Sequence, residues 1–348
     1  MSWSMNHLMV GITPSENWEK IGIPGGDRWI AEGHRGLLVQ IRGDWEFLAN
    51  VLGLPPHNHA INNCWMCAAS NTIAHLLWNN CGPNAGWRRT KRSHAAWEQD
   101  YRIRSAAIPL LFRVFVGLTI SAVAIDTLHV VDLGVAAHVL GNIFLLVCLK
   151  RRGGTIESRV AALGDEIEAW HRARRQQSGL RGKLTLQRLK SESGLPKFKG
   201  KGASVRALLP FALDLARREH LEDRIIGIAT YLNEFYDIIH QQSLFLKQWA
   251  VDRLGFIVNI FCNLYTDLSR HYFDKDEKYF KATPKLHLFL HLAEDQVKSF
   301  QINPKQFWCY ADEDLVGQLV EIASATHPSS LAELGLIKWL LLTLGPKE

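Results

Sequence analysis

Two pairs of side chains in this sequence have the residue types and spacing to hold a metal ion. Cys64 and Cys67 form a C-x-x-C pair, whose thiolates can share one Zn²⁺. Asp126 and His129 lie one helical turn apart, so both would point the same way in a helix. Together these residues supply the four ligands of a zinc site, which is the arrangement the sequence predicts. The alternative is that Asp126 and His129 are a polar pair at the edge of a core helix.

A third pair, His287 and His291, has the i, i+4 spacing that also allows two imidazoles to share a metal. No Glu directly follows the first His, as it does in the metalloprotease H-E-x-x-H pattern. Packing, or contact with a phosphate, is therefore the interpretation that the sequence favours for this pair.

The elements that must position these residues are mainly helical. After an irregular lead-in (1–35), the apolar run Gly36–Ile41 predicts a buried strand that ends at Asp44, and Trp45–Leu54 has helical spacing. A basic segment, 176–202, rich in Gly and Ser, predicts a loop. The further helices expected are 110–120, 135–149, 156–175, 203–221, 225–246, 249–273, 285–292 and 312–324, and 307–311 reads as a short strand-like entry to the last of these.

The order of these motifs resembles that of the CACTA (En/Spm) group of cut-and-paste DNA transposases. Arg42-Gly43-Asp44 followed by Cys64-x-x-Cys67 is similar to the segment around that family's second catalytic Asp, and the related hAT group also carries a C-x-x-C there. Asp126-x-x-His129 with its Leu-Gly-Val tail, and Lys285-x-His287-x-x-x-His291, resemble later family motifs. The run 308–319 (WCYADEDLVGQL) resembles the segment that bears the catalytic Glu, here Glu313.

This resemblance implies an α/β core of RNase H-like type, built from 36–60 and 280–348, with a mostly helical insertion at 61–279. Asp44 and Glu313 would be catalytic ligands of Mg²⁺ or Mn²⁺ in two-metal phosphodiester chemistry. The family's first catalytic Asp has no evident counterpart, because Asp27 is the sole Asp before Asp44 and follows no apolar strand. The resemblance therefore implies an N-terminally truncated transposase that binds DNA and cleaves it only if a first Asp is supplied.

Charge is consistent with a nucleic-acid partner. Residues 150–201 contain fourteen Lys or Arg against five acids, although the whole chain carries only +6. Such a segment can neutralise phosphates, or it can simply be a solvated face. The residues expected to contact DNA are Arg88, Arg89, Lys91, Arg92, Lys183, Arg188, Lys190, Lys197, Lys199, Lys201, His287 and His291.

Composition narrows the remaining classes of protein. Six sparse cysteines favour a reducing compartment, and the first residues contain no secretory signal, so we expect a nuclear or cytoplasmic protein. The apolar stretch 106–149 is interrupted by charged residues and predicts core rather than a membrane span. The expected partner is DNA, with homo-oligomerisation left open and no small-molecule substrate. The competing hypothesis is a helical, zinc-stabilised structural or interaction protein.

Overall fold

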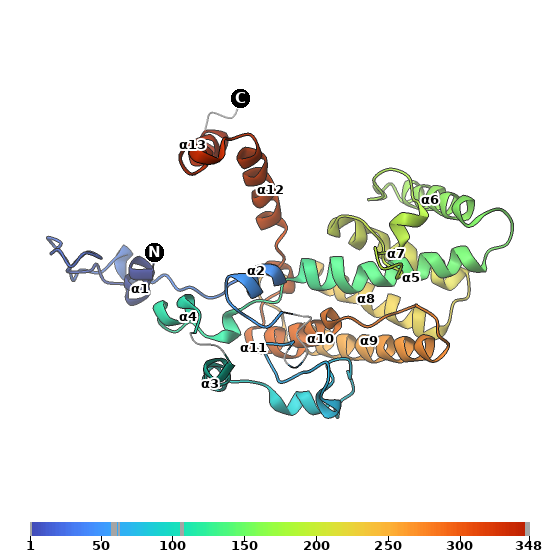
Figure 1. Cartoon of the computed structure of the whole chain (residues 1–348), viewed down its shortest axis with the longest axis horizontal. Coiled ribbons are helices and arrows are strands. Elements are labelled where there is room, and N and C mark those ends of the chain that lie inside the picture. Colours follow the sequence, from blue (N-terminus) through green and yellow to red (C-terminus); the bar gives the residue numbers. More distant parts are fainter. Residues whose placement is uncertain (1, 57–60, 62, 105–107, 345–348) are drawn as a thin grey trace.

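The computed structural model describes residues 2–56, 61, 63–104 and 108–344, and these residues form a helical protein (Figure 1). The central body contains η5 (Leu128–Ala136), a π-helix that runs directly into α5 (Ala137–Lys150), with α7 (Gly202–Arg218), α8 (Asp223–Gln241) and α9 (Gln248–Asp274). α6 (Ile156–Ala173) packs on α5 and α7, and α10 (Pro284–His291) packs on η5 and α9. A second π-helix, η7 (Leu292–Val297), continues α10 and leads into α11 (Lys298–Phe300).

Amphipathic spacing explains why these segments are helices. In α9 the buried positions include Leu254, Val258, Phe261 and Tyr265, which recur at intervals of three and four and so lie on one face. The stretch Leu128–Lys150 is long and apolar enough to cross a membrane, but 89% of its apolar window is buried inside the structure. Its role as a core helix, expected from the sequence, is confirmed.

The shorter elements surround this body. They are α1 (Ser2–Val10), α2 (Trp45–Asn50), α3 (His94–Arg104), α4 (Leu110–Val114) and the 3₁₀ turns η1 (Ala31–Gly33), η2 (Ala74–Leu76), η3 (Gly86–Thr90), η4 (Ile120–Ala122), η6 (Leu186–Leu189), η8 (Pro304–Gln306) and η9 (Pro328–Ser330). At the C-terminal end, α12 (Tyr310–Ser324) and α13 (Leu331–Leu344) form a hairpin that stands away from the body (Figure 1).

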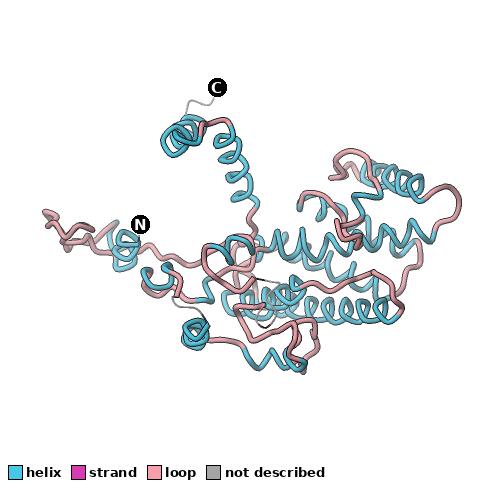
Figure 2. The backbone as a smooth tube through the Cα atoms, in the orientation of Figure 1, coloured by secondary structure: helices cyan, strands magenta, loops and turns pink. Residues whose placement is uncertain are grey.

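The expected α/β core of RNase H-like type is wrong. No strand is present in the described residues, and Figure 2 shows only helices and loops. The segment 36–41, expected to be a strand, forms a single parallel bridge, between Ile41 and Val123. The segment 307–311 also forms no strand, because α12 begins at Tyr310. The two parts assigned to that core therefore lack a sheet where they are described; 57–60 and 345–348 lie outside the described residues.

The single bridge nevertheless places the carboxylates of Asp44 and Asp126 at equivalent positions in the two bridged segments. Ile41 N–H donates to Ala122 O (2.8 Å), and Ala124 N–H donates to Ile41 O (2.8 Å). Asp44 and Asp126 each come three residues after a bridged residue, and each accepts hydrogen bonds from the first turn of the helix that follows. These caps begin α2 and the long helix η5–α5, so both side chains have a structural role at a helix N-terminus.

Candidate metal centre

Cys64 and Cys67 lie in a loop, residues 63–93, which we call the clamp loop. Its turn is set by backbone contacts: Met66 N–H donates to Cys64 Sγ (3.3 Å), and Asn63 N–H donates to Ala69 O (3.4 Å). Arg92 closes the loop from its far end, because its N–H donates to Met66 O (2.9 Å) and its guanidinium to Cys64 O (3.0 Å). Both thiols are 0% exposed and point into the body.

His287 and His291 reach the same point from α10. Pro284 occupies the first turn of this helix, where its missing N–H costs nothing, and the i, i+4 spacing puts both imidazoles on one face. His287 is 2% exposed and His291 is 0% exposed. Because neither side chain is more than 2% exposed, the structure gives no support to the expected phosphate contact and agrees with the alternative, packing.

The four side chains form one compact group. Cys64, Cys67, His287 and His291 each offer a ligand atom, and these atoms all lie within 4.8 Å of one another. Cys67 Sγ is 3.3 Å from His287 Nε2 and 3.4 Å from His291 Nε2, and the two Nε2 atoms are 3.1 Å apart. Ligand atoms of a tetrahedral Zn²⁺ site are separated by roughly 3.3–3.8 Å at normal bond lengths. The group could therefore hold a metal such as zinc.

A shell of polar and aromatic groups orients the ligands. His291 Nδ1 lies 2.5 Å from Asp295 Oδ2, one helical turn on, and Lys91 Nζ is 2.5 Å from the other oxygen of the same carboxylate. A carboxylate on the distal nitrogen fixes the ring tautomer and leaves Nε2 for the metal. Trp87 packs its indole edge against His287, with ring centroids 4.4 Å apart.

The electrostatics of the group favour a thiolate. Burial opposes ionisation of Cys64, but its contact with Cys67 and the positive charge of His291 together hold the pKa of Cys64 well below its ordinary value. Burial also works against protonation of His291, yet Cys64 and Asp295 raise the pKa of this imidazole to about 9. Burial and the neighbouring Cys64 hold the pKa of Cys67 well above its ordinary value, so the surroundings favour one thiolate in the pair. Thiolate is the form of Cys that binds metal.

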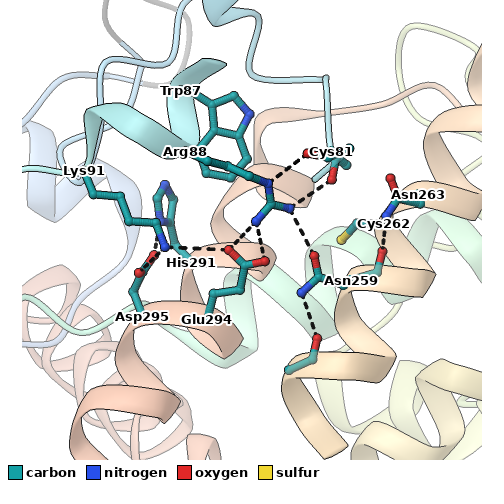
Figure 3. Close-up of polar contacts among 12 residues, drawn as sticks. Cys81, Trp87, Arg88, Lys91, Asn259, Cys262, Asn263, His291, Glu294 and Asp295 are labelled. Atoms are coloured by element: carbon teal, nitrogen blue, oxygen red, sulfur yellow. Dashed lines mark hydrogen bonds and ion pairs between the residues drawn. The ribbon is translucent and has the colours of Figure 1, made fainter. Parts of the chain in front are cut away.

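A buried ion-pair network holds the clamp loop to the body next to this group (Figure 3). The Arg88 guanidinium pairs with both oxygens of Glu294 on η7 and donates to Asn259 Oδ1 on α9 (3.0 Å). It also donates to the carbonyls of Cys81 and Gly82 (2.9 Å each). The network joins the loop, α9 and η7 around one cation.

Asp126 and His129, the other half of the expected zinc set, are not part of the group. His129 Nδ1 contacts Asp126 Oδ2, and His129 Nε2 is 2.9 Å from Glu313 Oε1 on α12. Burial works against protonation of His129, but Asp126 and Glu313 outweigh it and raise the pKa of the imidazole. Of the expected zinc set, the structure places the two cysteines in a group that could hold a metal and places Asp126 and His129 outside it, where they attach α12 to the body.

The two expected catalytic carboxylates lie near this second cluster. Asp44 lines a cavity of about 200 Å³ together with Asp126, His129 and Lys285, and the Asp44 side chain caps α2 through Phe47 N–H (2.7 Å). Glu313 pairs with His129. Among the described residues, Asp44 and Glu313 belong to no group of ligands able to hold a metal, so the expected Mg²⁺ or Mn²⁺ site has no support.

The expected DNA contacts divide into two sets. Arg88, Lys91 and Arg92 form ion pairs with Glu294, Asp295 and Asp100 respectively, although Lys91 is still exposed; Arg89 is also exposed. In the second basic segment Lys183, Lys199 and Lys201 are exposed, while Arg188, Lys190 and Lys197 are half-buried. The guanidinium of Arg188 donates to the carbonyls of Arg181 (2.9 Å) and Lys183 (3.0 Å), which gives it a role in holding the segment's own fold.

Glu294, Asp295 and Trp87 were missed from the sequence. Asp295 had a readable signal, because it follows His291 at i, i+4 and carboxylates commonly orient ligating imidazoles. Arg88 and Glu294 are 206 residues apart, and nothing local in the sequence indicates that they pair.

No protein-family model, curated protein or solved structure matches this chain.

Proposed function

We propose that this protein is a zinc-stabilised DNA-binding protein that does not cleave DNA. The zinc part of the proposal rests on the buried group Cys64, Cys67, His287 and His291, and the DNA-binding part on the basic segment 150–201. Four protein ligands fill a tetrahedral Zn²⁺ shell and leave no position for water or substrate, which is the pattern of structural zinc sites. Thiolate and imidazole suit zinc, whereas Mg²⁺ and Mn²⁺ prefer oxygen ligands.

The zinc would act as a clamp between distant parts of the chain. Cys67 and His287 are 220 residues apart, and the metal centre would join the clamp loop to α10 beside the ion pairs that Arg88 and Lys91 make with η7. Because such a site does not exist in the unfolded chain, its binding free energy contributes directly to folding.

The absence of cleavage follows from what the acidic residues do. Metal-dependent phosphodiester hydrolysis needs carboxylates free to hold two cations a few ångströms apart. Asp44 caps α2, Asp126 accepts from Leu128 and Cys309 N–H (2.9 and 3.0 Å), and Glu313 pairs with His129. These carboxylates are used to hold the fold together.

DNA as the partner is supported by the charge of 150–201 and by the resemblance to CACTA-type transposases. Lys183, Lys199 and Lys201 are exposed and lie in the chain on either side of η6 and just before α7, where they can approach a phosphate backbone. Affinity of this kind would be independent of base sequence and strongly dependent on salt.

The test is duplex DNA binding by the full chain as a function of salt. Replacing Lys183, Lys199 and Lys201 by Ala should flatten the slope of log K against log salt concentration by up to about 2.7, at roughly 0.9 per phosphate contact. A matched control replaces the exposed lysines Lys247, Lys275 and Lys278 and removes the same charge. Equal weakening by both variants, or no binding at about 50 mM salt, would contradict the proposal and favour a zinc-stabilised interaction protein.

A further inference from the structure

In the described residues, the ion pairs and hydrogen bonds that attach the hairpin of α12 and α13 to the body lie near its base. In the first turn of α12, Asp312 pairs with Arg42 (2.8 Å), Glu313 with His129 (2.9 Å), and Tyr310 O–H donates to Asp132 Oδ2 (2.5 Å). At the far end, Lys338 Nζ donates to Ala325 O (3.1 Å), which joins the two helices to each other. Figure 1 shows the hairpin standing away from the body beyond its base.

This hairpin exposes aliphatic side chains over most of its length. On α12, Val316 is 56% exposed and Val320 is 57% exposed. On α13, Leu336 is 55%, Ile337 is 49% and Leu341 is 67% exposed. At about 100° per residue, the exposed apolar positions of α13 cover more than half of its circumference. A helix that is apolar nearly all round is normally buried.

The exposed area is large enough for a stable interface. Ten Val, Leu and Ile side chains on the two helices are between 37% and 67% exposed, which together amounts to roughly 800 Å². This total is of the same order as the area of about 800 Å² that each partner contributes to a standard protein interface. A membrane is a poor occupant, because a 14-residue helix is too short to span a bilayer, which takes about 20 residues.

We infer that this hairpin binds the same hairpin of a second copy of the chain, forming a four-helix bundle. Val316 and Val320 on α12, and Leu336 and Leu340 on α13, are i, i+4 pairs, the spacing with which helices pack side by side. Beyond the first turn of α12, the described hairpin carries Asp314, Glu321, Glu333 and Lys338 as fully charged residues, a net charge of −2 for each copy, so two copies can meet without a strong like-charge penalty. A two-fold pairing matches one apolar surface with its equal.

The experiment is the mass of the full chain in solution, measured by light scattering or sedimentation equilibrium without DNA. The wild-type chain is expected to be a dimer at about 10 μM, corresponding to a Kd below that concentration. The variant Val320→Glu with Leu336→Glu is expected to be a monomer with unchanged zinc content. The control, Phe256→Glu with Phe273→Glu, places the same charges on exposed positions of α9 and is expected to remain a dimer.

If the Glu variant fails to fold, the milder Val320→Ser with Leu336→Ser serves in its place, and a rise in Kd of at least about tenfold supports the inference. A monomeric wild-type chain, a hairpin variant that stays dimeric, or a control that dissociates equally would overturn it. Polydisperse aggregates in place of a dimer would also overturn it, because they indicate an apolar surface that does not bind a specific partner. Because no DNA is present, the result is independent of the proposed DNA binding.

Discussion

Removal of Arg88 tests how the clamp loop is held. Its side chain and that of Glu294 are each 15% exposed, and Arg88→Ala would leave the Glu294 carboxylate buried without its cation. Breaking a buried pair in this way costs about 3–5 kcal/mol. Lys91 Nζ stays 3.7 Å from Glu294 and offsets part of the loss, so we expect destabilisation of about 3 kcal/mol.

The assay is urea unfolding of the zinc-saturated chain. The double variant Arg88→Met with Glu294→Gln should recover part of the loss, because it leaves no unpaired charge. The matched control is Arg253→Ala, which removes an exposed pair with Glu234 and should cost at most about 1 kcal/mol. A loss below about 1 kcal/mol for Arg88→Ala, or a double variant as unstable as the sum of the two single variants, would refute the reasoning.

Three further predictions concern other parts of the molecule. Burial raises the pKa of Asp132 to about 6, so the folded chain holds this proton more tightly than the unfolded chain does. The free energy of unfolding should therefore fall by up to about 3 kcal/mol as the pH rises from about 4 to about 7. In unfolding measured as a function of pH, Asp132→Asn should remove this fall. A Cβ at Gly141 would lie 2.4 Å from Lys197 N, so Gly141→Ala should lower the free energy of unfolding in urea by about 1–3 kcal/mol. Gly255 in α9 has open space around it, so Gly255→Ala should raise the free energy of unfolding by about 0.5–1 kcal/mol. Glu313→Ala should leave DNA affinity unchanged within about twofold in a binding titration, since Glu313 faces His129; a tenfold change would show that it reaches DNA.

Local patterns predicted the long amphipathic helices well, but the expected helix 110–120 is helical only over Leu110–Val114 (α4), and α3 and α13 were not expected. The expected ranges 156–175 and 249–273 match α6 (Ile156–Ala173) and α9 (Gln248–Asp274) to within two residues, because each has a strong apolar stripe. The expected strand at 36–41 failed for a non-local reason. An apolar run shows that a segment is suited to a sheet, but only a neighbouring strand makes one, and here a single bridge is formed.

The sequence identified one of the two ligand pairs of the candidate metal centre. The C-x-x-C pair was readable because its two ligands are adjacent in the chain, and Asp126-x-x-His129 and His287-x-x-x-His291 were equally suitable as the second pair. Choosing between them requires knowing which helix faces the clamp loop. That choice is made by the packing of α10 against α9 and η5, which spacing within one segment cannot reveal.

The central claim is that Cys64, Cys67, His287 and His291 hold one zinc ion. The most direct measurement is the metal content of the full chain, purified without added metal, by mass spectrometry of the dissolved protein. We predict about one zinc per chain, lost in Cys67→Ser and in His291→Ala and retained in Asp126→Ala and His129→Ala. A wild-type chain without zinc would contradict the account. So would zinc that is lost in Asp126→Ala and His129→Ala but retained in His291→Ala.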